Sequence, residues 1–344
     1  MTYFPQSSAS DQPGGGDTAA SPQLSLRQRL GAFWLNLLFW VAAHAPWLAR
    51  GTVNFWVWAG WLFSPAMRRN TLANARQVLG ETSTPRARRK LARQWIRGMF
   101  LFVYDVGRHS HMTLTQMRAE VKEIQGQSHY DAARALRRGL IVATAHFGAF
   151  EGAVAALRDR ENEVHVVFQR DRFSRFDVVR SQLHERLGIH EAPIDDGVRS
   201  WMRIREALLR DEAVLIQADR VMPGQRGMRM PFFGGEVEIP IGPAKLALLT
   251  GAPIVPIFAV RSPQGTLTIE IQPPILIDAA SSDPLTVVVR KLAAAIETMI
   301  QKHPEQWLML HQPWCEKTVD ASQEVAATQP LENPMPVEAA RVSG

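Results

Sequence analysis

One segment constrains the fold of this chain more than any other, residues 140–151 with the sequence LIVATAHFGAFE. A short run of mostly apolar, β-forming residues ends at His146, and an alanine-rich helical pattern begins near Glu151. The segment therefore predicts a strand, a tight turn and a helix, with His146 at the strand's carboxyl end and Glu151 in the first helical turn. Ligands bind at that edge of open α/β sheets, and an imidazole oriented by a carboxylate can act as a general base. We predict that His146 and Glu151 are catalytic.

A histidine with an acidic residue five positions later is by itself a weak signal. Chance produces such His–acid pairs in a chain with 10 His and 33 Asp plus Glu. Only the first pair has a strand pattern before it and a helix pattern after it, whereas a proline interrupts each of the other two. For an isolated histidine a structural role is the usual interpretation, and the context favours catalysis here. The three pairs are His146–Glu151, His190–Asp195 and His311–Glu316.

Beyond residue 122 short apolar runs alternate with amphipathic helical patterns, which predicts an α/β fold. We expect a mixed, mostly parallel sheet flanked by helices. Polar residues follow four of the strands. If these strands are parallel neighbours, the polar residues meet at one edge of the sheet, the rim, and form a substrate site there. The alternative is that these residues are polar only because strands commonly end in polar surface turns. The strands are expected at 140–145, 163–168, 213–217, 254–260 and 266–272, the helices at 174–187, 198–210, 242–250 and 284–302, and the rim residues are His146, Arg170, Asp219 with Arg220, and Arg261.

A Gly- and Arg-rich stretch, 221–230, is expected to be a loop, and its Arg226 and Arg229 could hold phosphates. The following Phe233 and Gly234 are candidate substrate-binding residues, and Gly234 and Gly235 would permit close approach of the backbone to a ligand. A plain surface turn is the alternative. Gly242 and Pro243 predict a helix start, and a helix N-terminus can hold phosphate.

The N-terminal third is unusually rich in tryptophan, with six of the ten tryptophans between positions 34 and 61. Residues 31–49 carry no formal charge, so we expect a membrane-spanning or embedded helix over 30–49 and an interfacial helix over 51–64. A buried core helix is the alternative. Basic residues between 86 and 97 would lie on an anionic leaflet, unless they form a solvated helix face. The expected organisation is a disordered 1–24, a membrane segment 25–67, a catalytic domain 68–316 and a disordered tail 317–344.

Charge and cysteine content narrow the class of protein further. The net charge of +6 favours binding to a negatively charged partner, which could be nucleic acid, anionic lipid headgroups or an acidic protein. The single cysteine, Cys315, excludes an intramolecular disulfide framework and a cysteine-based zinc site. We find no nucleic-acid-binding motif, and the aromatic residues cluster in the apolar segment rather than among the basic residues.

Several motifs occur together in an order that resembles the bacterial lipid A late acyltransferase family of lauroyl and myristoyl acyltransferases and phosphatidylinositol mannoside acyltransferases. This family lies within the lysophospholipid acyltransferase superfamily, and the resemblance covers about residues 28–316. The motifs are Arg69-Asn70-x-x-x-Asn74, His146-x-x-x-x-Glu151, Ala218-Asp219, Phe232-Phe233-Gly234, Gly242-Pro243-Ala244-x-Leu246-Ala247, Thr250-Gly251-Ala252-Pro253-Ile254-Val255-Pro256 and His303-Pro304-Glu305-Gln306-Trp307.

The resemblance implies a glycerolipid-acyltransferase-like fold and transfer of an acyl chain from acyl carrier protein or coenzyme A to a hydroxyl of a lipid or glycolipid, without metal or other cofactor. It implies His146 as general base and Glu151 as its orienting acid. Asp219 and Arg261 match family positions, and Arg170 matches the arginine after the second strand. It also implies a bacterial inner membrane protein whose catalytic domain faces the cytoplasm. The family usually has Gln where this chain has Arg220.

The chemistry of such a site needs donors for a tetrahedral oxyanion. Backbone N–H groups at the helix start after His146 and the side chain of Arg170 are the predicted donors. Arg220, Arg261 and the loop at 221–230 are predicted to hold acceptor phosphates or the phosphopantetheine arm of the donor. The alternatives are a lysophospholipid acyltransferase, a thioesterase or hydrolase using the same pair, and a non-enzymatic basic module that binds anionic lipid or nucleic acid. No Gly-x-Ser-x-Gly motif supports a serine nucleophile.

Overall fold

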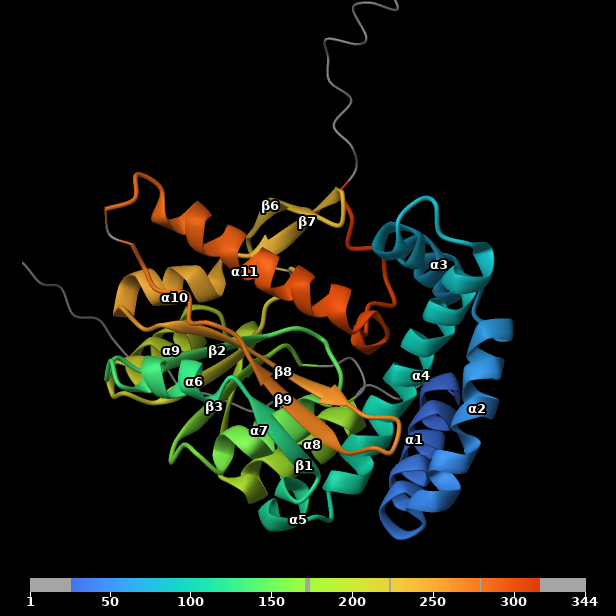
Figure 1. Cartoon of the computed structure of the whole chain (residues 1–344). Helices are drawn as coiled ribbons and strands as arrows, with labels where there is room; N and C mark the ends of the chain where they lie inside the picture. Colours follow the sequence, from blue (N-terminus) through green and yellow to red (C-terminus); the bar gives the residue numbers. More distant parts are fainter. Residues whose placement is uncertain (1–25, 171–173, 223, 279, 316–344) are drawn as a thin grey trace, which may run out of the picture.

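A seven-stranded sheet forms the centre of the protein, and all neighbouring strands are parallel except β8 and β9 (Figure 1). The computed structural model describes residues 26–170, 174–222, 224–278 and 280–315. The sheet confirms the predicted α/β fold. In spatial order its strands are β1 (Val121–Gln125), β9 (Leu267–Ile271), β8 (Ile254–Arg261), β2 (Leu140–Thr144), β5 (Ala213–Gln217), β3 (Val164–Phe168) and β4 (Ile189–Pro193).

Helices cover both faces of the sheet, so its central strands are buried on both sides. In β2, Ile141 and Ala143 pack into one core, and Leu140 and Val142 pack into the other. The strands expected from the sequence are found to within one residue. The first face carries α9 (Val198–Leu209), α10 (Gly242–Thr250) and α11 (Pro284–Lys302), and the second carries α5 (Leu114–Arg118), α6 (Gln127–Arg134), α7 (Phe150–Arg158) and α8 (Ser174–Leu187).

Four N-terminal helices pack together at one side of this domain, where Figure 1 shows α1 and α2 beside α4. The predicted helix boundary near residue 50 is wrong, because the break falls at Ala45. Pro46 disfavours helical backbone in the residue before it, and Ala45 has φ −137° and ψ 62°. The helices are α1 (Leu26–His44), α2 (Pro46–Phe63), α3 (Pro65–Leu79) and α4 (Pro85–His109).

Within the described residues, no helix has both the length and the apolar character that a bilayer crossing requires. The predicted span over 30–49 therefore finds no support. Several large apolar side chains of α1 and α2 are nevertheless exposed, including Trp47 at 77% and Phe63 at 76%. The two predicted disordered segments, 1–24 and 317–344, lie outside the described residues.

A two-stranded hairpin replaces part of the loop expected at 221–230. Its strands are β6 (Gly227–Phe232) and β7 (Gly235–Pro240), joined by Phe233 and Gly234. Both connecting residues have positive φ, 49° and 70°, as a type I′ turn requires. A Cβ added at Gly234 would meet nothing within 4 Å, so turn geometry explains this glycine without any close approach of another segment. Two short 3₁₀ helices, η1 (Ile194–Asp196) and η2 (Pro304–Gln306), complete the described elements.

Candidate active site

His146 and Asp219 form a hydrogen-bonded pair at the carboxyl edge of the sheet. Nδ1 of His146 lies 2.8 Å from Oδ1 of Asp219, and the backbone N–H of His146 donates to the same oxygen at 3.1 Å. Strand register explains the meeting, because Thr144 of β2 pairs with Gln217 of β5, and each catalytic candidate follows its strand by two residues. Parallel strands end at the same edge, so both side chains arrive there together.

Asp219 is buried and is held as a carboxylate. The indole Nε1–H of Trp307 donates to its second oxygen at 3.0 Å. Burial alone raises the pKa of this carboxyl, but the charge and hydrogen bond of His146, the charge of Arg220 and the hydrogen bond of Trp307 outweigh it and hold the pKa well below its usual range. The carboxylate can therefore accept a hydrogen bond from the Nδ1–H of His146 throughout the neutral pH range.

The hydrogen bonds of the imidazole assign its tautomer. An ionised Asp219 accepts from Nδ1, so the proton of neutral His146 lies on Nδ1. The guanidinium of Arg220, which can only donate, lies 2.8 Å from Nε2, consistent with a lone pair there. A lone pair on Nε2 with a carboxylate behind Nδ1 is the arrangement of a general base. Arg220 occupies the hydrogen-bonding position at that lone pair.

Glu151 contacts His184 rather than His146 in this structure, and its predicted catalytic role stays a prediction. It lies buried in the first turn of α7, and its Oε2 is 3.3 Å from Nε2 of His184 on α8. The other ring nitrogen of His184 is 2.8 Å from Oε1 of Glu191. Because the chain enters α7 before Glu151, the side chain of Glu151 faces α8. Asp219 from the neighbouring strand makes the contact with His146 that we predicted for Glu151.

Two of the predicted rim arginines are engaged away from His146. The guanidinium of Arg261 donates to Asp105 of α4, and both side chains are largely buried. Arg170 is exposed and forms an ion pair with Asp196 at 2.9 Å. Arg261 thus ties the end of β8 to α4, and Arg170 lies at the surface beyond β3. Of the predicted rim, the structure brings together His146, Asp219 and Arg220.

Phe233 and Gly234 lie in the hairpin turn, where the contacts of Phe233 are structural. Its backbone N–H donates to Glu297 of α11 at 2.7 Å, and its carbonyl accepts from Gln77 of α3 at 2.8 Å. These bonds fasten the hairpin to two helices. Substrate binding by Phe233 and Gly234 stays a prediction.

Two of the backbone N–H groups that follow His146, among those expected to face an oxyanion, are already bonded. Gly148 donates to the carbonyl of Gln306 at 2.8 Å, and Ala149 donates to that of Ala259 at 3.2 Å. A Cβ at position 148 would lie 1.9 Å from the carbonyl oxygen of Ala259, so only glycine fits this close approach. The guanidinium of Arg220 is the side-chain donor that lies beside Nε2.

The segment after η2 completes the site, and our sequence analysis assigned it no role. The backbone of Leu308 donates to the carbonyl of His146 at 2.7 Å, and Phe147 pairs with Trp307 in an isolated antiparallel bridge. Trp307 therefore supports both the His146 loop and Asp219. The motif His303–Trp307 was visible in the sequence, but nothing in it indicated a contact with residue 219.

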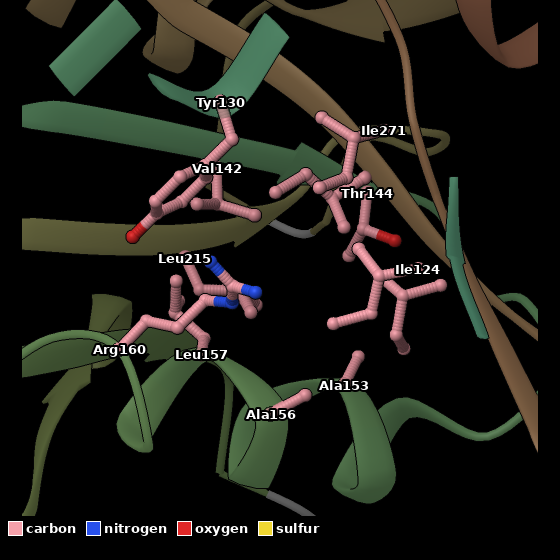
Figure 2. A pocket seen from close by; sticks show the side chains of 12 residues that line it. Ile124, Tyr130, Val142, Thr144, Ala153, Ala156, Leu157, Arg160, Leu215 and Ile271 are labelled. Atoms are coloured by element: carbon pink, nitrogen blue, oxygen red, sulfur yellow. The ribbon is translucent and has the colours of Figure 1, made fainter. Parts of the chain in front are cut away.

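A narrow apolar cavity lies between the sheet and α7 (Figure 2). Its volume is about 30 Å³, enough for a water-sized molecule but not for an extended chain. Thr144 lines it from the end of β2, Ala153 lines it from α7, and Tyr130 lines it from α6. Tyr130 is anchored by a hydrogen bond to Glu161.

Within the described ranges, no group of three or more His, Cys, Asp or Glu residues is arranged to hold a metal ion. The candidate site brings together a histidine, a buried carboxylate and an arginine.

The family follows from comparison with known proteins. Residues 19–316 match the model of the bacterial lipid A biosynthesis acyltransferases, and the chain belongs to this family. It is 30% identical over 196 residues to a phosphatidylinositol mannoside acyltransferase of Mycobacterium tuberculosis H37Rv, covering 56% of this chain and 59% of the relative. It is 28% identical over 182 residues to the Mycolicibacterium smegmatis protein of that name, covering 52% and 57%. The matches thus span less than two thirds of these relatives.

Proposed function

We propose that this protein transfers a fatty acyl chain from a thioester to a hydroxyl group of a membrane lipid or glycolipid. The observation that carries this proposal is the His146–Asp219 pair with its Nε2 lone pair, 2.8 Å from Arg220, in a member of an acyltransferase family. A general base of this kind acts on a hydroxyl that it deprotonates and that then attacks a carbonyl. In acyl transfer the lipid acceptor supplies the hydroxyl, and the thioester donor supplies the carbonyl.

In the proposed reaction, Nε2 of His146 accepts the proton of the acceptor hydroxyl while its oxygen attacks the thioester carbonyl. The resulting tetrahedral oxyanion collapses, the carbon–sulfur bond breaks, and the imidazolium returns the proton to the departing thiolate. The products are an ester and a free thiol. Such base catalysis typically contributes about 10²–10⁴-fold to a rate.

Asp219 and Arg220 have separate tasks in this scheme. The buried Asp219 carboxylate holds the tautomer of His146 and stabilises the imidazolium. Arg220 must leave Nε2 before the hydroxyl can bind there, and its guanidinium is then placed to donate to the oxyanion. Arg220 thus exchanges a ground-state contact for one made in the transition state.

The proposal also covers the chemical class of the acceptor and of the donor. The relatives are named phosphatidylinositol mannoside acyltransferases, which supports a glycolipid acceptor. A lysophospholipid acceptor is the alternative. The donor in this proposal is acyl carrier protein or acyl-coenzyme A, which present the same thioester chemistry.

We further propose attachment to the cytoplasmic face of a bacterial inner membrane through α1, α2 and α4. A cleft of about 530 Å³ between α2 and α4 is lined by five cationic side chains and no acidic one. Trp47, Trp58 and Phe63, which are exposed, lie on the same helix α2. Cations attract anionic headgroups, and aromatic side chains favour the membrane interface. The cationic residues of this basic cleft are Arg86, Arg89, Lys90, Arg93 and Arg97.

The test is thiol release from acyl carrier protein and acyl-coenzyme A by purified protein, with and without lipid extract, for the wild type and His146→Ala. Release that needs both lipid and His146 would support acyl transfer, and mass spectrometry would then identify the acylated lipid. Release without lipid would indicate a thioesterase instead. Normal lipid-dependent release by His146→Ala would refute the mechanism.

A further inference from the structure

A cavity of about 710 Å³ lies between α9 and α10, on the face of the sheet opposite α7. Its volume falls in the range of small-molecule sites, which are mostly apolar with a few convergent polar groups. Trp201 of α9 and Leu246 of α10 contribute to its apolar wall, and Ile216 of β5 lines it from the sheet. The wall is thus suited to a chain with little charge of its own.

Three cationic side chains line the same cavity from three different elements. Arg205 lies on α9, Lys245 on α10, and Arg226 in the segment before β6. In the part of the chain that the structure describes, none of the three takes part in an ion pair, although many of the other arginines do. One carboxylate, Asp195, lines the cavity, and it accepts a hydrogen bond from the backbone of Arg170 at 2.8 Å. The cavity therefore has a surplus of positive charge.

The cavity is close to the proposed base. Gln217 lines it and is the residue of β5 that pairs with Thr144 of β2. His146 and Asp219 each follow these paired residues by two positions. Neighbouring strands lie about 4.8 Å apart. The end of the cavity at Gln217 is therefore close to both His146 and Asp219.

We propose that this cavity is a substrate subsite for a phosphate group carried on an elongated, otherwise weakly charged chain. Arg205, Arg226 and Lys245 hold the phosphate, because guanidinium and ammonium groups bind phosphate oxygens strongly. The apolar wall holds the chain that leads toward His146. Within the proposed function, on which this inference rests, two substrates carry this chemistry, the phosphopantetheine arm of the acyl donor and a phosphate-bearing glycolipid acceptor.

The primary test is direct binding, which does not depend on turnover. Isothermal titration would measure two probes, the non-hydrolysable thioether S-hexadecyl-coenzyme A and a phosphatidylinositol mannoside in detergent, with wild type and with Arg205→Ala, Arg226→Ala and Lys245→Ala. The matched control is Arg203→Ala, which removes one exposed cation from α9 that forms an ion pair with Asp196 and does not line the cavity. We expect each cavity variant to weaken one probe by about tenfold and the control to change neither.

The probe that loses affinity identifies the source of the phosphate, and the KM for the same substrate should rise with it. Cavity variants that bind both probes as tightly as Arg203→Ala does would overturn the inference. Failure of the proposed function would look different, because wild type would then bind a probe in a cavity-dependent way yet form no acylated lipid. Thermal unfolding of each variant would establish that these exposed substitutions leave the fold intact.

Discussion

Asp219 Oδ1 lies 2.8 Å from Nδ1 of His146, although the two residues are 73 positions apart in the chain. The contact exists because β2 and β5 are neighbours in the sheet, while β3, β4 and the connecting helices α7, α8 and α9 lie between them in the sequence. The acid closer in sequence, Glu151, instead bonds to His184. The sheet order therefore decides which carboxylate supports the proposed base.

Asp219→Asn should reduce acyl transfer by about 10²–10⁴-fold, because an amide neither fixes the Nδ1–H tautomer reliably nor stabilises the imidazolium. Lipid-dependent thiol release measures this effect. His146→Ala should lose a similar amount, and the double variant should be little worse than either single one, since the two residues act as a unit. Full additivity of the two losses would argue against a coupled pair.

Glu151→Gln should act mainly on stability. Removing one charge from a buried ion pair typically costs about 3–5 kcal/mol, and Glu151 touches His184 rather than His146. Urea unfolding would measure the loss. The pH profile of kcat for the folded fraction should keep its wild-type shape, whereas a displaced profile would return the orienting role to Glu151.

Stability should fall on the alkaline side because of His184. Burial lowers the pKa of this imidazole, but hydrogen bonds and charges of Glu151 and Glu191 outweigh it and raise the pKa to about 9. An unfolded histidine titrates near about 6.5, so the protonated form stabilises the fold fully below that pH. The contribution is lost as the pH rises through about 9. Calorimetry of wild type and His184→Gln between pH 6 and 9.5 should show a steeper fall of Tm in the wild type; equal slopes would contradict this.

Arg220→Ala should expose Nε2 of His146. Diethyl pyrocarbonate modifies imidazole nitrogens, and the Arg220 hydrogen bond must break before it reacts. A hydrogen bond to a charged group contributes roughly 1.5–3 kcal/mol, so the rate at His146 should rise by about 10- to 150-fold. Peptide mass spectrometry would follow the modification, with Arg229→Ala as an exposed control. The same Arg220→Ala variant should lose turnover despite the more accessible base, because it lacks the oxyanion donor.

Charge reversal in the basic cleft should weaken binding to anionic vesicles. Each basic residue near such a surface contributes about 1 kcal/mol, so Arg86→Glu with Lys90→Glu should reduce partitioning by tenfold or more. Flotation with vesicles containing phosphatidylinositol would measure it. Arg290→Glu with Lys291→Glu makes the same charge change on exposed positions of α11. Equal losses from both pairs would indicate a general charge effect rather than a cleft that faces the membrane.

Local patterns in the sequence determined much of this protein. Apolar β-forming runs predicted the strands, and Gly242-Pro243 marked a helix start at its observed boundary, because these signals act within a few residues. Position at a strand end was enough to single out His146, Asp219 and Arg220. The hairpin was missed because its turn, Phe233-Gly234, places a bulky residue at positive φ, where the usual signal is asparagine or glycine.

The partners of the site residues were decided only by the tertiary structure. Glu151 and Asp219 are both carboxylates after strands, and their sequences do not tell which one meets His146. Sheet order brings Asp219 to the imidazole, whereas the turn into α7 carries Glu151 to His184. Arg261 likewise has the sequence context of a rim residue, but the packing of α4 places Asp105 against it. Spacing along the chain sets which residues lie near a strand end, and hydrogen bonding between distant strands and helices sets what they contact.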